Sequence, residues 1–549
     1  MTPTAPGFFA TPAAAKAVAE ARAVAILVGG YDGSANYGDI AQLDAGVDLL
    51  QRLGSGLLVL PVVERPYLAN HRTLTEDAPE RCGPALFLGP AEEPGDGLVP
   101  VPAPIDLAFG ACYLYGGGYL NPSWGGRKLE MLRAAEDLLK AGGPPRICRL
   151  SSGLQADPDW IAGLAPEDAG LLGSFEVLGG RDQASTEMLS ELSSAALVLD
   201  TADDAVGALR PYLDVEAPPF ADGSLHVNVH FAEHDWVTGS PERMLDFYLD
   251  FLAELGRRAA RPIVAHPLVA YADPRIDERP ALERLAAAAP GRGIEVAESI
   301  VLRPAALAEA TASLQRASLT LSCSYHVALT SLMLKVPAVL ISDNPYYEQK
   351  AAGLREAFGL PPELAVPTEA DPQERAAAVA GVVFEAAAGE ALRGNLVAGR
   401  DLFLRRRAEV EGELLGRLGS AALGAFGERL ETMAKRLRER AAEPAELHAQ
   451  LAVLRFDHQE LERRAGEAVA GHDSQPRRDP AGVPPSAADG EAIAAGAALV
   501  AAEIKAREAT ARSTEAEAMV STLLNSRSWR LTAPLRRTAA RLRHSRRAG

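Results

Sequence analysis

The amino-acid sequence predicts two consecutive α/β domains that face a cleft, followed by a C-terminal region that is helical, partly coiled coil and partly disordered. Three observations predict this fold class. Short apolar runs alternate with amphipathic segments from residue 22 to about residue 390. A Pro-rich break at residues 216–223 divides the series into two, and beyond residue 390 the strand pattern ends. Alternating strands and helices favour a parallel sheet covered on both faces.

The first series predicts an N-terminal domain over residues 22–215, preceded by an extension over residues 1–21. Its apolar runs are bounded by Gly or Pro, as is typical of buried strands. We expect these strands at residues 23–30, 57–63, 85–89, 112–118 and 145–150. Residues 39–53 and 127–140 carry apolar side chains every three or four positions, which predicts helices between the strands.

The second series predicts another domain of the same kind over residues 222–390. We expect its strands at residues 225–231, 261–267, 319–323 and 337–342. The helices that separate them are expected at residues 241–258, 304–316 and 326–334. Two such domains in succession predict a cleft between them.

The remaining chain predicts helices and a linker. Residues 391–465 carry an apolar seam with helical spacing, made of Leu430, Met433, Leu437, Leu447, Leu451, Leu454 and Leu461. Pro444 interrupts this seam, so a single long coiled coil is not expected. Residues 466–490 have the composition of a flexible linker, residues 491–525 predict a helix, and residues 526–549 form a basic tail.

Composition excludes several classes of protein. The 549 residues are 48% apolar and 23% charged, which is typical of globular cores. The net charge of −18 argues against nucleic acid as a partner, because phosphate contacts need positive charge. The four cysteines lie far apart and form no C-x-x-C pair, so we expect neither a zinc site nor a disulfide framework. No metal-ligand cluster or cofactor motif appears, and the absence of a signal-like or bilayer-length apolar run indicates a cytoplasmic protein.

A first glycine-rich turn follows the strand expected at residues 23–30. The segment VGGYDGSANYGD contains Gly29, Gly30 and Gly33, then Asn36, and Asp39 is suited to begin the next helix. Such a turn can direct backbone N–H groups and a helix N-terminus at an anion or a polar sugar. It matches neither the Walker loop nor the G-x-G-x-x-G spacing, so a purely structural turn is the alternative.

A second glycine-rich turn lies in LYGGGYLNPSWGG, where a strand enters Gly116, Gly117 and Gly118. Loops at the carboxyl ends of parallel strands form the crevice of an α/β domain. Asn121 and Trp124 can contact a sugar ring there, and a structural loop is again the alternative.

A histidine and a lysine mark the third segment, residues 318–350. His326 follows a strand at the start of an apolar helix, and Lys350 follows the next strand by a short loop. Strand ends bring both residues to one rim of a parallel sheet. A general acid beside an anion-binding lysine is one interpretation, and a histidine buried in the core is the other.

These three segments, in this order and spacing, resemble the polysaccharide pyruvyl transferase family over roughly residues 22–360. The matching positions are Gly29, Gly30, Asn36, Gly38 and Asp39, then Gly116, Gly117 and Gly118, then Arg181, Asp182 and Ser185, then His266 at a strand end with Asp273 downstream, and finally His326, Pro337 and Lys350. The joint order of these motifs is more specific than any one of them.

The resemblance implies two Rossmann-like domains, as in GT-B glycosyltransferases, and transfer of a pyruvyl group from phosphoenolpyruvate to two hydroxyls of one sugar. His326 would then be the catalytic acid. Donor binding would involve Lys350, Arg181, His266 and Ser324. Acceptor or anion binding would involve Gly29, Gly30, Asn36, Asp39, Gly117, Gly118 and Asn121. Such pyruvylation belongs to the biosynthesis of exopolysaccharides and other glycans of the cell envelope.

One departure from the family pattern keeps other functions open. The family usually has an Arg two residues before the His, and Ser324 stands there in this sequence. A serine cannot replace the permanent charge and fork geometry of an Arg, although Arg316 or Arg303 can substitute if the fold brings them near. The alternatives are a GT-B-type glycosyltransferase that uses a nucleotide sugar, and a non-catalytic scaffold of a glycan-synthesis complex. The C-terminal helices are candidates for contacts in such a complex or in a homo-oligomer.

The basic tail points to a membrane surface. Its segment SRSWRLTAPLRR is similar to C-terminal segments of bacterial glycosyltransferases that build surface glycans. Eight arginines and no acid lie between Arg527 and Gly549, and Leu535 and Leu542 can share one helical face. This pattern suits peripheral contact with the anionic inner face of the cytoplasmic membrane, and a solvated basic end is the alternative.

We therefore expect deletion of residues 526–549 to abolish binding to anionic vesicles and to preserve activity on a soluble acceptor. Each basic residue near an anionic bilayer contributes about 1 kcal/mol, and salt screens this attraction. Vesicle co-sedimentation of the full and shortened chains at several salt concentrations measures the effect. A full chain that ignores anionic vesicles at low salt would refute the membrane role.

Overall fold

The computed structural model describes most of the chain up to residue 439. The described residues are 6–34, 36–53, 56–77, 84–90, 96–105, 107–143, 146–192, 197–215, 217–233, 241–271, 277–303, 306–342, 345–439, 459 and 463. The chain divides into two compact units, residues 1–418 and 419–549. The linker, the last helix and the basic tail expected from the sequence lie outside the described residues.

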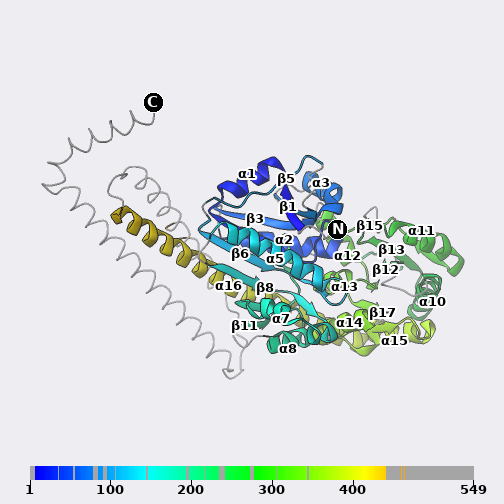
Figure 1. Ribbon diagram of the computed structural model, residues 1–549. Helices are drawn as coiled ribbons and strands as arrows, with labels where there is room; N and C mark the ends of the chain where they lie inside the picture. The colour runs from blue at the N-terminus through cyan, green and yellow to red at the C-terminus, as the bar shows by residue number, and fades with distance from the viewer. Residues whose placement is uncertain are drawn as a thin grey trace, which may run out of the picture. The chain divides into compact units, whose positions relative to one another are not determined.

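The first sheet contains eleven strands drawn from residues 6–200 (Figure 1). They are β1 (Pro6–Ala10), β2 (Ala23–Val28), β3 (Leu57–Glu64), β4 (Leu86–Pro90), β5 (Val99–Pro100), β6 (Phe109–Leu114), β7 (Gly117–Leu120), β8 (Ile147–Ser151), β9 (Leu154–Ala156), β10 (Val177–Gly180) and β11 (Leu197–Asp200). The path runs β5-β1-β4-β3-β2-β6-β8-β10-β9-β7, and β11 pairs with β10. The pairs from β4 through β3, β2, β6, β8 and β10 to β11 are parallel, as the alternation of strands and helices predicts.

The N-terminal residues add to this sheet, which the sequence did not predict. β1 pairs antiparallel with both β4 and β5. Helix α1 (Pro12–Glu20) follows, because Thr11 caps its first turn by accepting a hydrogen bond from the N–H of Ala14 and a proline stands at its start. A five-residue strand with no alternating pattern gives little signal in the sequence.

Helices pack on the first sheet through apolar faces. They are α2 (Tyr37–Gln51), α3 (Leu68–Asp77), α5 (Gly125–Ala141), α6 (Pro158–Ala162), α7 (Pro166–Gly173), α8 (Gln183–Leu192) and α9 (Ala205–Leu209). Leu129, Leu132 and Leu139 of α5 join a buried cluster with side chains of β2, β4 and β6. Helix α2 contacts β2, β3 and α9. Burial of these side chains supplies most of the driving force for this half of the molecule.

The second sheet contains seven parallel strands drawn from residues 225–367. They are β12 (Leu225–His230), β13 (Ile263–Val269), β14 (Ile294–Val296), β15 (Ile300–Val301), β16 (Leu319–Ser322), β17 (Ala338–Ser342) and β18 (Ala365–Pro367). Its helices are α10 (Pro241–Ala259), α11 (Arg279–Ala288), α12 (Leu307–Arg316), α13 (Tyr325–Met333), α14 (Pro345–Phe358) and α15 (Pro372–Phe384). The two-sheet architecture expected from the sequence is therefore present, and the residue ranges proposed as domains remain predictions.

Strand β13 corrects one expectation. We expected a strand that ends at His266, with Asp273 downstream. The strand instead runs through His266 and Pro267 to Val269, so His266 lies in its middle. The pairing of β13 with β15 uses the residues beyond Pro267, which explains why the strand continues. Asp273 lies outside the described residues.

Elements of the two sheets meet beside α2. The backbone N–H of Tyr37 donates to the carbonyl of Ala270, just beyond β13, at 2.9 Å. Asn36 forms an isolated bridge with Tyr271, and the Tyr37 hydroxyl lies 2.9 Å from the Thr330 hydroxyl of α13. Proteins of the α/β class bind ligands at the carboxyl ends of their parallel strands. The functional site is therefore expected where elements of the two sheets meet.

Helix α16 (Ala386–Glu439) follows the second sheet. Its residue Phe403 packs against Phe358 of α14, with the ring centroids 5.0 Å apart. Further along, Arg407 and Glu411 reach back to the first half of the chain. Among the described residues, no helix combines the length and the apolar character that crossing a bilayer requires.

Candidate functional site

His326 lies in the first turn of α13, directly after the end of β16. The helix begins there because Ser324 has an extended backbone and its side chain accepts from the N–H of Val327. The side chain of His326 is 14% exposed, so it is accessible but largely enclosed. Ser324, where the family has an Arg, therefore acts as the N-cap of this helix.

Helix α2 packs on the first sheet, in what we call the first half of the molecule, and α13 belongs to the second sheet and the second half. The two helices approach each other where Gly38 of α2 lies against His326 of α13. Asn36 caps α2 by accepting from the N–H of Gly38 at 2.9 Å. A Cβ atom placed on Gly38 would lie 1.8 Å from Nδ1 of His326, which no side chain can tolerate. Position 38 therefore has to be a glycine, because the imidazole ring of His326 from the second half occupies the space that a side chain would need.

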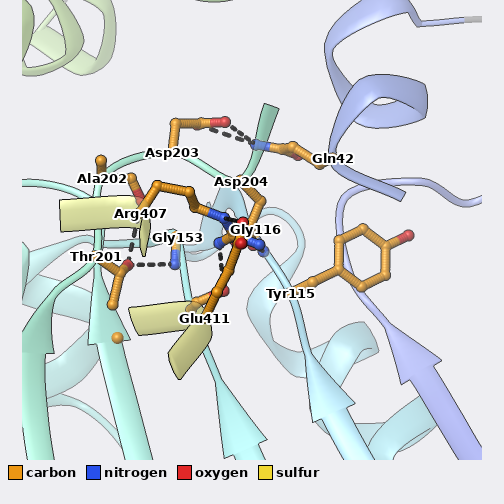
Figure 2. Close-up of polar contacts among 12 residues, drawn as sticks. Gln42, Tyr115, Gly116, Gly153, Thr201, Ala202, Asp203, Asp204, Arg407 and Glu411 are labelled. Atoms are coloured by element: carbon orange, nitrogen blue, oxygen red, sulfur yellow. Dashed lines mark hydrogen bonds and ion pairs between the residues drawn. The ribbon is translucent and has the colours of Figure 1, made fainter. Parts of the chain in front are cut away.

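Gln42 and Asp203 face the other nitrogen of His326. Nε2 of His326 lies 3.1 Å from the amide nitrogen of Gln42 and 3.6 Å from a carboxylate oxygen of Asp203. The Gln42 amide also donates to Asp203, 3.0 Å from each carboxylate oxygen (Figure 2). The Gln42 amide nitrogen and the Asp203 carboxylate therefore both face Nε2 of His326.

Asp203 is fully buried and carries its charge there. It lies between β11 and α9, where it also accepts from the N–H of Ala205 at 2.9 Å. Burial alone would raise the pKa of Asp203, but His326, Arg181 and the Ala205 N–H outweigh it and hold the pKa below its usual range.

Arg181 brings a buried cation to the same place. It directly follows β10, and its guanidinium lies 3.5 Å from Asp203 and bonds to Gln155. The guanidinium carbon also lies 4.0 Å from the ring centroid of Tyr325, the residue between Ser324 and His326. Arg181 therefore places a permanent charge beside the segment where the family Arg is missing.

Lys350 and Asp39 complete the cluster from α14 and α2. Lys350 is partly buried, and burial together with the positive charge of Arg181 holds its pKa well below the usual value, although Asp39 and Asp203 oppose this. Burial raises the pKa of Asp39 to about 6, against the opposing effect of His326, Lys128 and Lys350. Lys350 and Asp39 are therefore close enough to Arg181, Asp203 and His326 for their charges to interact.

The two glycine-rich turns lie against each other beside the cluster. The N–H of Gly30 donates to the carbonyl of Gly116 at 3.2 Å. A Cβ on Gly29 would overlap the Tyr115 ring at 2.4 Å, and one on Gly30 would lie 2.7 Å from the Asp39 carboxylate. Gly117 has a φ of +132°, which few other residues adopt. Aromatic and acidic side chains thus fill the space that these glycines leave.

His266 and the two arginines considered as substitutes for the missing Arg have other neighbours. His266 contacts His226 at 2.8 Å between ring nitrogens and stacks with Phe220, and Arg316 lies over the same Phe220 ring at 4.0 Å. Burial lowers the pKa of His266 to about 4. Arg303 is exposed after β15.

Asn121 and Gly118 form a local turn of their own. The amide nitrogen of Asn121 donates to the carbonyl of Gly118 at 2.7 Å, and its oxygen accepts from the N–H groups of Ser123 and Trp124. These bonds hold the loop that leads into α5. The proposed contact of Asn121 with a sugar remains a prediction.

Sequence reasoning missed three residues that contact this cluster: Gln42, Asp203 and Tyr325. Gln42 lies one turn after Asp39 on the same helix, so helical spacing indicates it once Asp39 is chosen. Asp203 and Asp204 come three and four residues after the end of β11, which was not predicted as a strand from the sequence. Nothing in the sequence indicates that the aromatic face of Tyr325 would receive Arg181.

A family model described as polysaccharide pyruvyl transferase matches residues 36–345. This match covers more than half of the chain. The protein therefore belongs to the polysaccharide pyruvyl transferase family, and it is a transferase. None of the curated proteins matches this sequence.

Several solved structures resemble the chain at low sequence identity. UDP-GlcNAc 2-epimerase from Neisseria meningitidis bound to UDP-GlcNAc has a TM-score of 0.44 at 10% identity, over 71% of this chain and 98% of that chain. The α,α-trehalose 6-phosphate synthase from Burkholderia multivorans has a TM-score of 0.42 at 14% identity, over 74% of this chain and 100% of that chain. These TM-scores and identities describe a distant likeness. The function proposed below rests on the family match and on the geometry of the site.

We expect Asp39→Asn to stabilise the protein at neutral pH. The folded-state pKa of about 6 lies above the ordinary value of 3.8, so the folded state holds this proton more tightly than the unfolded state does. The stability that this proton contributes is complete below about pH 4 and is lost as the pH rises through about 6. The variant should gain about 3 kcal/mol over the parent at pH 7, since the two pKa values differ by about 2 units and each unit corresponds to about 1.4 kcal/mol.

Urea unfolding of both proteins at pH 3 and at pH 7 measures this difference. The gain should disappear near pH 3, where the parent carboxyl is protonated in both states. An equal difference at the two pH values would contradict the raised pKa of Asp39.

Proposed function

We propose that this transferase moves a pyruvyl group from phosphoenolpyruvate to two hydroxyls of one sugar in a cell-surface polysaccharide or its precursor. The observation that carries the proposal is the position of His326, whose ring lies beside the Asp203 carboxylate in a cluster that also contains Arg181 and Lys350. An acid next to two cations fits a donor with a carboxylate, a phosphate and an enol carbon that must be protonated.

His326 acts as the acid in this proposal. Its imidazolium gives a proton to the methylene carbon of phosphoenolpyruvate, and the electron pair of the C=C bond forms the new C–H bond. The adjacent carbon then carries positive charge that its oxygen shares. Asp203 is buried and ionised 3.6 Å from Nε2, so its negative charge faces the ring that carries the proton.

The acceptor supplies two hydroxyls in sequence. The first attacks the cationic carbon and forms one C–O bond. The bond from that carbon to the phosphate oxygen breaks, and the second hydroxyl forms the other C–O bond of the ketal. Of the two hydroxyl protons released, one restores the proton on His326 and the other leaves with inorganic phosphate. Asp39 is suited to receive a hydroxyl proton, since its pKa of about 6 lies close to neutrality.

The anionic donor has two kinds of positive partner in this proposal. Arg181 and Lys350 provide charged hydrogen-bond donors. The N-termini of α2 and α13 also point their partial positive charge at the region of His326, because Gly38 and His326 lie in their first turns. Arg181 compensates for Ser324, since it stacks on Tyr325, the residue next to that position.

We expect His326→Asn to lower kcat by roughly two to four orders of magnitude, the usual range for loss of a general acid. Phosphate release from phosphoenolpyruvate with a saccharide acceptor measures turnover, and the melting temperature serves as the control for folding. An unchanged kcat in the folded variant would remove His326 from the mechanism. Turnover of a nucleotide sugar in place of phosphoenolpyruvate by the parent would refute pyruvyl transfer.

We also expect Lys350→Ala and Arg181→Ala to weaken donor binding by roughly tenfold or more, the equivalent of a lost charged hydrogen bond of about 1.5 to 3 kcal/mol. The lowered pKa of Lys350 adds a pH dependence, since a deprotonated amine no longer attracts an anion. Parent affinity should therefore fall as the pH rises, and Lys350→Ala should reduce this slope.

Calorimetric titration with phosphoenolpyruvate measures both effects. Arg243→Ala is a matched control, because Arg243 pairs with the exposed Glu369 on the surface of the second half. Parent-like affinity in both site variants would place the anion site elsewhere.

A further inference from the structure

Arg407, a buried arginine of α16, contacts residues that adjoin the candidate site. Arg407 of α16 has no exposed surface, and its guanidinium pairs with Asp204 and lies 3.3 Å from the hydroxyl of Ser152 (Figure 2). Its Nε donates to Glu411 one turn further along α16, at 2.9 Å. Burying a guanidinium is unfavourable unless its partners compensate the charge, so this contact is a strong constraint on the position of α16.

Asp204 connects Arg407 to the glycine-rich turns. One of its oxygens accepts from the N–H of Gly116 at 2.6 Å, and the other accepts from the Ser152 hydroxyl at 2.5 Å. The carbonyl of Gly116 in turn accepts from the N–H of Gly30. The path from Arg407 therefore runs through one carboxylate to both turns that border the site.

Asp204 also adjoins Asp203, which faces His326. The two carboxylates are neighbours in sequence and both are fully buried. Like charges so close repel each other, and each needs a cation of its own. Arg181 lies beside Asp203, and Arg407 pairs with Asp204. Without Arg407, Asp204 would have to take up a proton or move, and either change would disturb the adjacent Asp203.

We propose that Arg407 is a positioning residue for the transferase reaction, acting from α16 through Asp204 on Asp203 and on the turn at Gly116. This inference rests on the proposed function and deepens it, because it makes the C-terminal helix a part of the catalytic unit. A purely structural role of α16 would predict only a loss of stability when this contact is broken.

The test compares three full-length variants on the same helix. Arg407→Met removes the charge, Arg407→Lys restores a charge without the planar fork, and Phe403→Leu weakens the packing of α16 on Phe358 without touching Asp204. We expect Arg407→Met to lower kcat by about 10- to 100-fold while KM for phosphoenolpyruvate changes less than threefold, since small misplacements of catalytic groups cost rate more than binding. Arg407→Lys should recover part of kcat. Phe403→Leu should lower the melting temperature and keep kcat.

A second measurement does not depend on the donor. In protein labelled with ¹³C-histidine, the ring resonance of His326 is identified by its loss in His326→Asn. It should shift in Arg407→Met and stay in place in Phe403→Leu. If the parent does not use phosphoenolpyruvate, the proposed function fails, and this resonance still decides whether Arg407 positions the site.

Three outcomes would overturn the inference. The first is a folded Arg407→Met variant with parent kcat and an unshifted His326 resonance. The second is an equal loss of kcat in Phe403→Leu at the same fall in melting temperature. The third applies if Arg407→Met does not fold: it is a parent-like kcat in Arg407→Lys, whose amine cannot reproduce the forked contacts of the guanidinium with Asp204, Ser152 and Glu411.

Discussion

Two neighbouring buried carboxylates, Asp203 and Asp204, are the constraint on which the rest of the site depends. Charges without contact with water must be compensated by cations and N–H donors, and here these come from distant parts of the chain. Arg181 follows β10, Gln42 lies on α2, and Arg407 lies on α16. The electrostatic requirement of two side chains therefore fixes the relative positions of three elements around the end of the first sheet.

The division of labour between these carboxylates links structure to chemistry. Asp203 faces His326 and belongs to the proposed reaction, whereas Asp204 is fully occupied by Arg407, Ser152 and the Gly116 backbone. Glu411 has a similar structural role further along α16, because Arg52, Arg210 and Arg407 surround it and lower its pKa to about 2. The net stability that such buried ion pairs contribute is small, because desolvation offsets their attraction, but removal of one partner leaves an uncompensated buried charge.

Much of the fold follows from periodicity in the sequence, because buried parallel strands and amphipathic helices leave strong local patterns. The strands at residues 57–64 and 338–342 and the helix at residues 241–259 lie within one or two residues of the predicted bounds. The short strand β1, which lies between β5 and β4, gave no such pattern. The site is harder to predict, because its contacts join residues far apart in sequence. His326 and Lys350 stand out by their place after strands, but the partner of His326 is decided by packing, and no local feature of Arg407 shows that it is buried.

The contact of Gly38 with His326 has a consequence for how such proteins change over time. The missing side chain belongs to one half of the molecule, and the ring that occupies its space belongs to the other. The first half therefore cannot acquire a side chain at this glycine unless the histidine ring in the second half moves or is replaced. A chimaera that combines the halves of two relatives would keep an intact site only if this glycine and this histidine are both retained. The two residues therefore have to be exchanged together, although they belong to different halves.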